Sequence, residues 1–242
     1  KLFGSKDGKH YAIYNLKKPL FDILSAATVE NLALKDVNIS GKTDVGALAN
    51  EANNATRINN VHVDGVLAGE SGIGGLVWKA DNSKITNSSF KGRIINSYET
   101  KAPYNIGGLV GQLTGINAVV DKSKATITIS SNADSTNQTV GGLAGLIEKD
   151  ALISNSYAEG DINNVKRFGS VAGVAGYLWD RDSNEERHAG RLHNVLSDVN
   201  VMNGNAISGY HYRGMRITDS SSNKDNRVYK VTLEKDEVVT KE

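Results

Sequence analysis

The chain contains no cysteine among its 242 residues. This absence excludes disulfide bonds, thiolate nucleophiles and zinc sites built on cysteine. Proline, at 2 residues, and aromatic residues, at 6%, are also scarce. No apolar run approaches the roughly 18 residues that a membrane-spanning helix requires, so we expect no membrane insertion.

The charges are balanced and dispersed. Lys and Arg number 28 against 27 Asp and Glu, which leaves a formal net charge of +1. A protein that binds a polyanion through its overall charge has a basic surplus or a basic cluster. We therefore expect no nucleic-acid partner. The sequence opens at Lys1 with charged residues and no signal-peptide pattern, and we interpret it as a piece of a larger protein.

The chain is rich in glycine, at 25 residues, and in asparagine to a similar degree. Both residue types tolerate the positive φ angles that tight turns need. Between these turn residues, Val and Ile alternate with polar residues in short runs, which is typical of β-strands. The composition therefore predicts many short strands joined by tight turns.

A glycine-rich phrase recurs along the sequence. It reads GIGGLVWKA from Gly72, NIGGLVGQL from Asn105 and TVGGLAGLI from Thr139, with a degenerate copy, FGSVAGVAG, from Phe168. Its central aliphatic residue recurs in steps of 28, 33, 34, 28 and 36 residues, at Leu48, Leu76, Leu109, Leu143, Val171 and Ile207. A second landmark, an aliphatic residue with Asn or Asp two positions later, starts at Val29, Ile58, Ile85, Ile153, Leu192 and Ile217, with a degenerate copy from Val119. The chain therefore carries six or seven copies of one compound unit.

This repeat predicts a single-stranded parallel β-helix of about six to seven rungs with a short N-terminal cap. The spacing of leucine-rich repeats and the paired helices of ankyrin or TPR units are not indicated, and propeller blades are longer. The aligned aliphatic residues would form an internal ladder. A second ladder, which would hold a bend in the αL conformation, would comprise Asn60, Asn87, Asn155 and Asn194. We predict a cap over residues 1–28, repeats over 29–222, and an exit strand and linker over 223–242.

Two other interpretations of the glycine-rich phrase are excluded. A phosphate-binding loop would need a glycine upstream of Gly41-Lys42-Thr43 where Asp36 stands. A membrane helix contact would need the segment from Gly107 to Gly111 to lie within a long apolar run, which it does not.

Several stretches resemble one family. They are NLKKPLFDILSAATVENLALKDVNISG near the start, the repeated IGGLVG and VGGLAG, and the segments ITNSSFKG and ISNSYAEG. Over nearly the whole chain they resemble the N-terminal, non-catalytic region of Gram-positive immunoglobulin A1-specific zinc metalloproteases. The resemblance implies a secreted, cell-wall-associated parent that cleaves the hinge of human immunoglobulin A1, as a virulence factor in immune evasion. It implies immunoglobulin A1 and the parent's own catalytic domain as partners, and we expect a monomer.

The H-E-x-x-H zinc motif of that family is absent from this sequence, whose histidines are His10, His62, His188, His193 and His211. We therefore expect no catalytic residue, metal site or cofactor in this fragment. The resemblance implies zinc in a separate C-terminal domain of the parent. The fragment itself would be a scaffold that recruits or positions a substrate.

Two stretches are candidates for binding a partner. WDRDSNEERHAGR, from Trp179 to Arg191, interrupts the longest repeat step, and GYHYRG, from Gly209, follows one rung later. Exposed aromatic and arginine side chains are typical interface anchors, so the candidate residues are Trp179, Arg181, Tyr210, Tyr212 and Arg213. The alternatives are a solvated loop with Trp179 covering the core, and ordinary aromatic stacking between rungs. A calcium loop is disfavoured because Glu185 and Arg191 stand where glycine and a bidentate glutamate are needed.

Two other functions remain open at the level of sequence. An adhesin-like module of a different parent would bind another host ligand. A glycan-active enzyme would need convergent carboxylates, and the available residues Asp121, Asp161, Asp180 and Asp198 show no convincing pair in their spacing.

Overall fold

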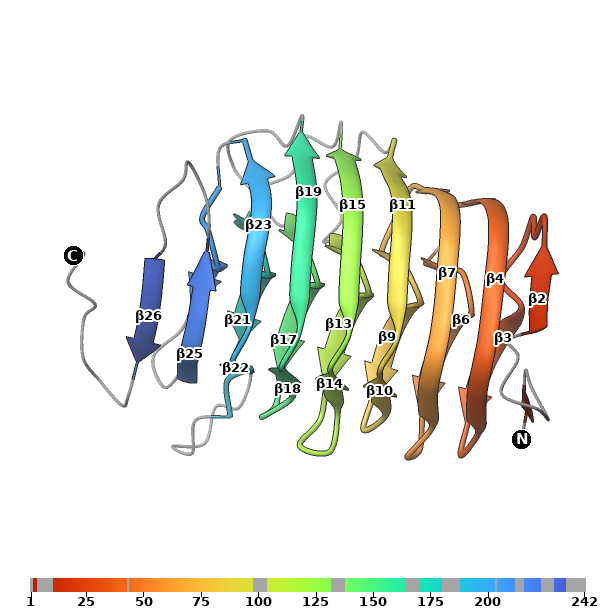
Figure 1. Ribbon diagram of the computed structural model, residues 1–242, viewed down its shortest axis with the longest axis horizontal. Helices are drawn as coiled ribbons and strands as arrows, with labels where there is room; N and C mark the ends of the chain where they lie inside the picture. Colours follow the sequence, from red (N-terminus) through yellow and green to blue (C-terminus); the bar gives the residue numbers. More distant parts are fainter. Residues whose placement is uncertain are drawn as a thin grey trace.

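The computed structural model describes residues 2–3, 11–42, 44–97, 104–131, 138–163, 170–179, 188–202, 204–211, 216–222 and 229–233. Across these residues the chain forms strands and turns, with no helix. The strands wind into an elongated coil whose turns, here called rungs, stack along one axis (Figure 1). The predicted all-β parallel β-helix is confirmed.

The described strands form three sheets, here named A, B and C. The 14 strands of sheet A are β1 (Leu2–Phe3), β2 (Tyr11–Tyr14), β4 (Thr28–Gly41), β7 (Arg57–Gly69), β10 (Lys84–Thr86), β11 (Ser89–Asn96), β14 (Val119–Asp121), β15 (Lys124–Ser131), β18 (Leu152–Ser154), β19 (Tyr157–Asn163), β22 (Arg191–His193), β23 (Leu196–Val201), β25 (Arg216–Ser222) and β26 (Tyr229–Leu233). The 7 strands of sheet B are β3 (Phe21–Ser25), β6 (Ala49–Asn53), β9 (Val77–Asp81), β13 (Val110–Thr114), β17 (Ala144–Glu148), β21 (Ala175–Trp179) and β24 (Ser208–His211). The 5 strands of sheet C are β5 (Val45–Gly46), β8 (Ile73–Gly74), β12 (Tyr104–Gly107), β16 (Gln138–Gly141) and β20 (Ser170–Ala172).

Each complete rung runs from sheet C through sheet B into sheet A. Neighbouring rungs pair in parallel, and among the named strands the pair β25–β26 is the antiparallel exception. The register keeps like residues together: Leu113 of β13 stands opposite Ala80 on one side and Ile147 on the other. The repeat period of the sequence is therefore the length of one rung.

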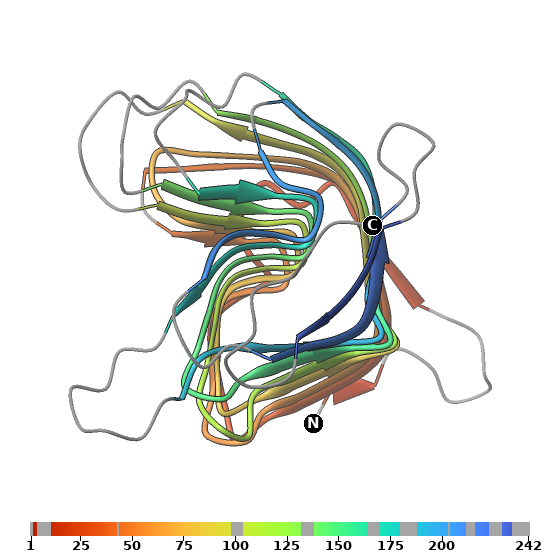
Figure 2. The same cartoon turned by 90° about the vertical axis from the view of Figure 1, so that its left-hand side faces the viewer.

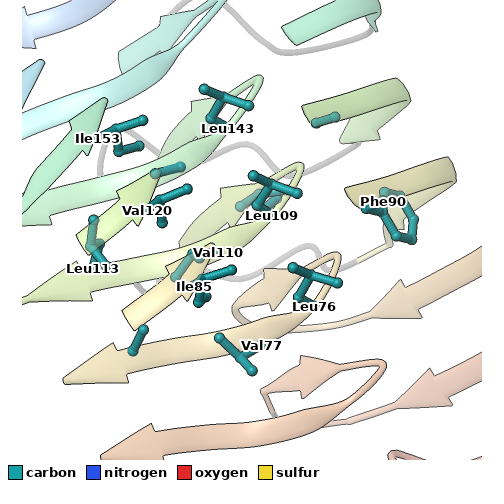
Figure 3. Packing of buried hydrophobic residues seen from close by; sticks show 14 of the residues in the cluster. Leu76, Val77, Ile85, Phe90, Leu109, Val110, Leu113, Val120, Leu143 and Ile153 are labelled. Carbon is teal, nitrogen blue, oxygen red and sulfur yellow. The ribbon is translucent and has the colours of Figure 1, made fainter. Parts of the chain in front are cut away.

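The central aliphatic residues of the glycine-rich phrase stack inside the coil (Figure 3). Backbone amides connect them along the axis at 2.9–3.2 Å, in the order Leu48, Leu76, Leu109, Leu143, Val174 and Ile207. The predicted assignment of Val171 to this ladder is wrong, because Val171 stands opposite Val140 in sheet C. The phrase SVAGVAG offers two valines three residues apart. Val171 lies in strand β20, and Val174 occupies the ladder position in the turn that follows.

Asparagines hold the bend in sheet A at which β10 gives way to β11. The residue at this bend has a φ between 47° and 55° in successive rungs, at Asn31, Asn60, Asn87, Lys122, Asn155 and Asn194. Asn60 and Asn194 each donate a side-chain hydrogen bond of 2.8 Å to the ladder asparagine of the preceding rung. Asn87 and Asn155 donate instead to Asn59 and Asp121, the residues just before the bend in the preceding rung.

A serine ladder that the sequence reasoning missed lies next to the asparagines. Its members are buried and follow the bend directly, at Ser88, Ser123, Ser156 and Ser220. Each hydroxyl donates to the carbonyl two residues earlier and accepts a backbone N–H from the preceding rung at 3.1–3.3 Å. The sequence pattern that could have predicted this ladder is the serine directly after the bend residue, in the recurring dipeptides Asn-Ser and Lys-Ser.

The glycine-rich phrase also narrows the coil where its second glycine packs against sheet A, a place here called the pinch. Figure 2, which looks along the axis, shows the connection from sheet C to sheet B bending towards sheet A. A Cβ built on the second glycine of the phrase would lie 2.1–2.9 Å from a sheet A side chain, in the pairs Gly75–Phe90, Gly108–Ala125, Gly142–Ala158 and Gly173–Ser197. Buried aliphatic residues fill the space on both sides of the pinch as one continuous cluster.

Candidate binding surface

The outer face of sheet B carries a pair of aromatic side chains at the end of β21. Leu178 is fully buried, and its neighbours Tyr177 and Trp179 are half-buried. Because side chains alternate along a strand, Tyr177 and Trp179 share the outer face. Their ring centroids are 5.2 Å apart, with the planes tilted by 39°. This geometry lies within the range of favourable aromatic contacts.

The neighbouring rungs extend this face. Tyr177 stands opposite Leu146 of β17, which in turn stands opposite Gln112 of β13. Gln112 Nε2 donates to Glu148 Oε1 at 2.9 Å, and the Glu148 side chain is only 3% exposed. We call the surface formed by Gln112, Leu146, Glu148, Tyr177 and Trp179 the aromatic face. Gln112, Tyr177 and Trp179 are its half-buried members, and Leu146 and Glu148 lie buried beneath them.

The predicted binding residues are only partly placed. Trp179 lies on the aromatic face, and the backbone of Tyr210 in β24 stands opposite Tyr177. Arg181, Tyr212 and Arg213 lie outside the described residues. Tyr177 was not among the predicted binding residues. Aligning Val174 with Ile207 would have found it, since Tyr177 and Tyr210 each follow three residues later.

The outer face of sheet A presents a second polar cluster. Lys124 Nζ lies 2.8 Å from Glu159 Oε1 and 5.1 Å from the centre of the Tyr157 ring. Burial, together with Glu159 and Asp198, raises the pKa of Tyr157 to about 12. Hydrogen bonds from Lys124 and Thr126 lower the pKa of Glu159. Glu159 is therefore held in its ionised form and is unsuited to act as a general acid.

Among the described residues, the carboxylates considered for glycan chemistry do not converge. Asp121 Oδ1 accepts hydrogen bonds of 2.7 Å from Ser154 and Asn155. Asp161 stands opposite Asn200 rather than Asp198, and Asp180 lies outside the described residues. Asp198 stands opposite Glu159, whose charge is engaged by Lys124. These positions do not support the acid–base pair that glycoside hydrolysis requires.

The described histidines lie apart in separate contacts. His62 contacts Ser89 and Asn60, His193 contacts Thr218, and His188 contacts Asp150. Within the described ranges there is no group of three or more His, Cys, Asp or Glu side chains that could hold a metal ion. The same part of the chain has no helix long and apolar enough to span a membrane.

Comparison with known proteins places this architecture in a family. A model of the M26 IgA1-specific metallo-endopeptidase N-terminal region matches residues 1–65, and a model of the GLUG motif matches residues 69–95 and 136–163. An immunoglobulin A1 protease of Streptococcus sanguinis is 95% identical over 242 residues, which cover 100% of this chain and 13% of that protein. Over its whole length the chain therefore resembles the N-terminal region of M26 immunoglobulin A1-specific metallo-endopeptidases.

Other relatives agree with the M26 assignment. The zinc metalloprotease ZmpC of Streptococcus pneumoniae is 42% identical over 99% of this chain and 13% of its own length. A solved IgA1 protease structure, 70% identical, has a TM-score of 0.88 over 100% of this chain and 19% of that chain. The chain thus spans about an eighth of the length of the curated relatives it matches. The two GLUG matches coincide with the β8–β11 and β16–β19 rungs.

Proposed function

We propose that this M26 chain is a non-catalytic scaffold that recruits substrate for a secreted, cell-wall-associated zinc metalloprotease. By analogy with the relatives named immunoglobulin A1 protease, the substrate is immunoglobulin A1, cleaved in its hinge. The observation that carries the proposal is the aromatic face. Its Tyr177–Trp179 pair is half-buried and joined to neighbouring rungs.

Physical considerations support recruitment by this face. Large aromatic residues dominate binding energy when they are held rigidly, because little side-chain entropy is lost on association. Tyr177 is fixed by β17 and β24 on either side, and Leu178 anchors the strand in the core. The face is thus organised before a partner arrives, as a recruiting surface needs to be.

In this proposal catalysis takes place elsewhere in the parent. The zinc ion and the H-E-x-x-H motif belong to a separate domain, with which this chain docks as part of one monomeric polypeptide. The proposal assigns residues 1–28 to a cap, 29–222 to the recruiting rod and 223–242 to an exit strand and linker. β3 lies within the assigned cap and already stacks in parallel on β6, so the cap would end in the first strand of sheet B.

The test is a titration of purified residues 1–242 with immunoglobulin A1, with immunoglobulin A2 as the control ligand. We expect saturable binding to A1 without cleavage, and a loss of about tenfold or more in affinity for Trp179→Ala or Tyr177→Ala. Ile116→Ala is the matched control, because Ile116 is 64% exposed on a corner two rungs away.

Other results would redirect the proposal. Absence of binding at roughly tens of micromolar would remove independent recruitment. Unchanged affinity in both aromatic variants would move the site to another face. Binding to a different host protein would favour an adhesin-like module, and turnover of a polysaccharide would favour a glycan-active enzyme.

A further inference from the structure

The described residues that lead into β22 lie beside the aromatic face. β21 ends at Trp179, and the described chain resumes at His188. Ala189 then forms an antiparallel bridge with Glu148. Gly190 packs on Ile147, since a Cβ built on Gly190 would lie 2.5 Å from Ile147 Cγ2. The closing segment is therefore attached to β17, the strand that borders Tyr177.

Asp150 binds this closing segment through its backbone and its side chain. The Asp150 N–H donates to the His188 carbonyl at 2.8 Å. The Asp150 carbonyl accepts from Arg191 Nε at 2.9 Å and from Nη2 at 2.6 Å. The Asp150 carboxylate contacts His188 Nδ1. One residue thus fixes both the first and the last residue of the segment His188–Arg191.

A second copy of the same turn shows that the backbone does not require aspartate. Lys149 and Asp150 have φ values of 55° and 59°, and the equivalent Asn54 and Ala55 have 52° and 62°. In both turns the residue after the turn donates its N–H to the carbonyl of the residue before it, from Ala151 to Glu148 and from Thr56 to Asn53, at 3.1–3.2 Å. Alanine thus suffices where the next rung has a short corner. The carboxylate occurs where the corner is long.

We infer that Asp150 is a positioning residue for the aromatic face, and that its contact with His188 makes the position of that face depend on pH. The path runs from Asp150 through His188 and Ala189 to Glu148, which belongs to the face. Histidine gains its charge near pH ~6.5 in the absence of perturbation. A protonated His188 forms an ion pair with the carboxylate, whereas a neutral one keeps only a hydrogen bond.

Other charged groups surround this contact. Those next to it on its own turn and on β22 are Glu148, Lys149, Arg191 and His193, and Arg216 stands opposite Arg191 in β25. The stacked corner of the preceding rung, residues 115–118, has none. Glu148 is bound to Gln112 and Arg191 to the Asp150 carbonyl, so the carboxylate and His188 face each other directly.

The first test needs no binding partner. The chain has 2 tryptophans, so Trp78→Phe leaves Trp179 as the sole indole fluorophore. We expect its emission to titrate once between about pH 5 and pH 8. Asp150→Asn and His188→Asn should abolish that titration. His193→Asn and His62→Asn should retain it, since His193 contacts Thr218, and His62 contacts Ser89 and Asn60. If Trp78→Phe does not fold, acrylamide quenching of the two-tryptophan protein gives the same readout.

The second test uses immunoglobulin A1 and rests on the recruiting function proposed above. Affinity should be about two- to fivefold higher at about pH 5.5 than at pH 7.5, the effect expected of a partly exposed ion pair. Asp150→Asn should remove this dependence, and Asp150→Ala should weaken binding at both pH values.

The two arms separate the two proposals. A Trp179 titration without any binding would uphold the positioning role and reject recruitment. A pH-independent Trp179, or an Asp150→Asn protein with an unaltered titration, would overturn the positioning role whatever the binding result.

Discussion

At the scale of single residues, each of the three glycines of the phrase GGLxG is required because a side chain there would clash with a different backbone carbonyl. A Cβ on Gly107 would lie 1.9 Å from the Val110 carbonyl in its own turn. A Cβ on Gly108 would lie 2.0 Å from the Gly142 carbonyl of the next rung. A Cβ on Gly111 would lie 2.7 Å from the Asn105 carbonyl of sheet C. The motif is therefore set by close backbone approach.

The second glycine should be especially intolerant of change. In Gly142→Ala the new methyl would meet the Gly173 carbonyl at 2.0 Å and the Ala158 Cβ at 2.9 Å. We expect a loss of about 3 kcal/mol or more in the free energy of unfolding, because backbone must move. Gly69→Ala is the control, since its Cβ would meet only side-chain atoms, of Ile73 at 3.2 Å and of Val45 at 3.6 Å. Urea denaturation compares them, and equal stabilities would contradict the steric account.

Tyr157 should give the protein an alkaline limit. Its pKa is raised from 10.0 to about 12 by burial, Glu159 and Asp198, so the folded state holds the phenolic proton more tightly than the unfolded state. This stabilisation is complete below about pH 10 and is lost as the pH rises towards 12. Denaturation at a series of pH values should show the decline, and Asp198→Asn should reduce it. An identical decline in both proteins would exclude Asp198 as a cause.

At the scale of elements, the ladders explain which features could be predicted. Leu76, Leu109 and Leu143 recur in a fixed phrase, so their stacking follows from the sequence alone. Val174 could not be distinguished from Val171 by the sequence pattern, because both valines precede Ala-Gly in the degenerate copy. The bend residue in the αL conformation can likewise be predicted from the sequence wherever it is an asparagine.

The position of Lys122 offers a direct test of the bend. Lys122 has a φ of 49° and stands between Asn87 and Asn155 in the ladder. Asparagine tolerates the αL conformation better than lysine. We expect Lys122→Asn to raise the free energy of unfolding by about 0.5–1 kcal/mol. Lys122→Val should lower it, since β-branched residues are disfavoured there. A destabilised asparagine variant, measured by thermal unfolding, would contradict this view of the bend.

At the scale of the whole molecule, the fold was predictable and the proposed binding surface largely was not. The repeat pattern predicts the features that all rungs share, namely the ladders, the bends and the strand order. A binding surface depends on how single rungs differ from the others. The Asp150 contact has no second copy among the described residues, and Tyr177 has its counterpart, Tyr210, in the last rung, where the repeat is degenerate. Trp179 was found only because its segment interrupts the repeat. The pinch also escaped prediction, because it depends on the distance between sheets that are separated along the chain.

The parallel stacking of rungs has a mechanical consequence. The first and last strands, β1 and β26, lie at opposite ends of the coil (Figure 1), and the hydrogen bonds between rungs run along its axis. Tension between the ends therefore acts along those bonds, and the rungs separate one after another. Each rung of roughly 30 residues would release about 100 Å of chain when it opens. Such a rod yields stepwise under pull, and single-molecule stretching would record a series of small, evenly spaced extensions.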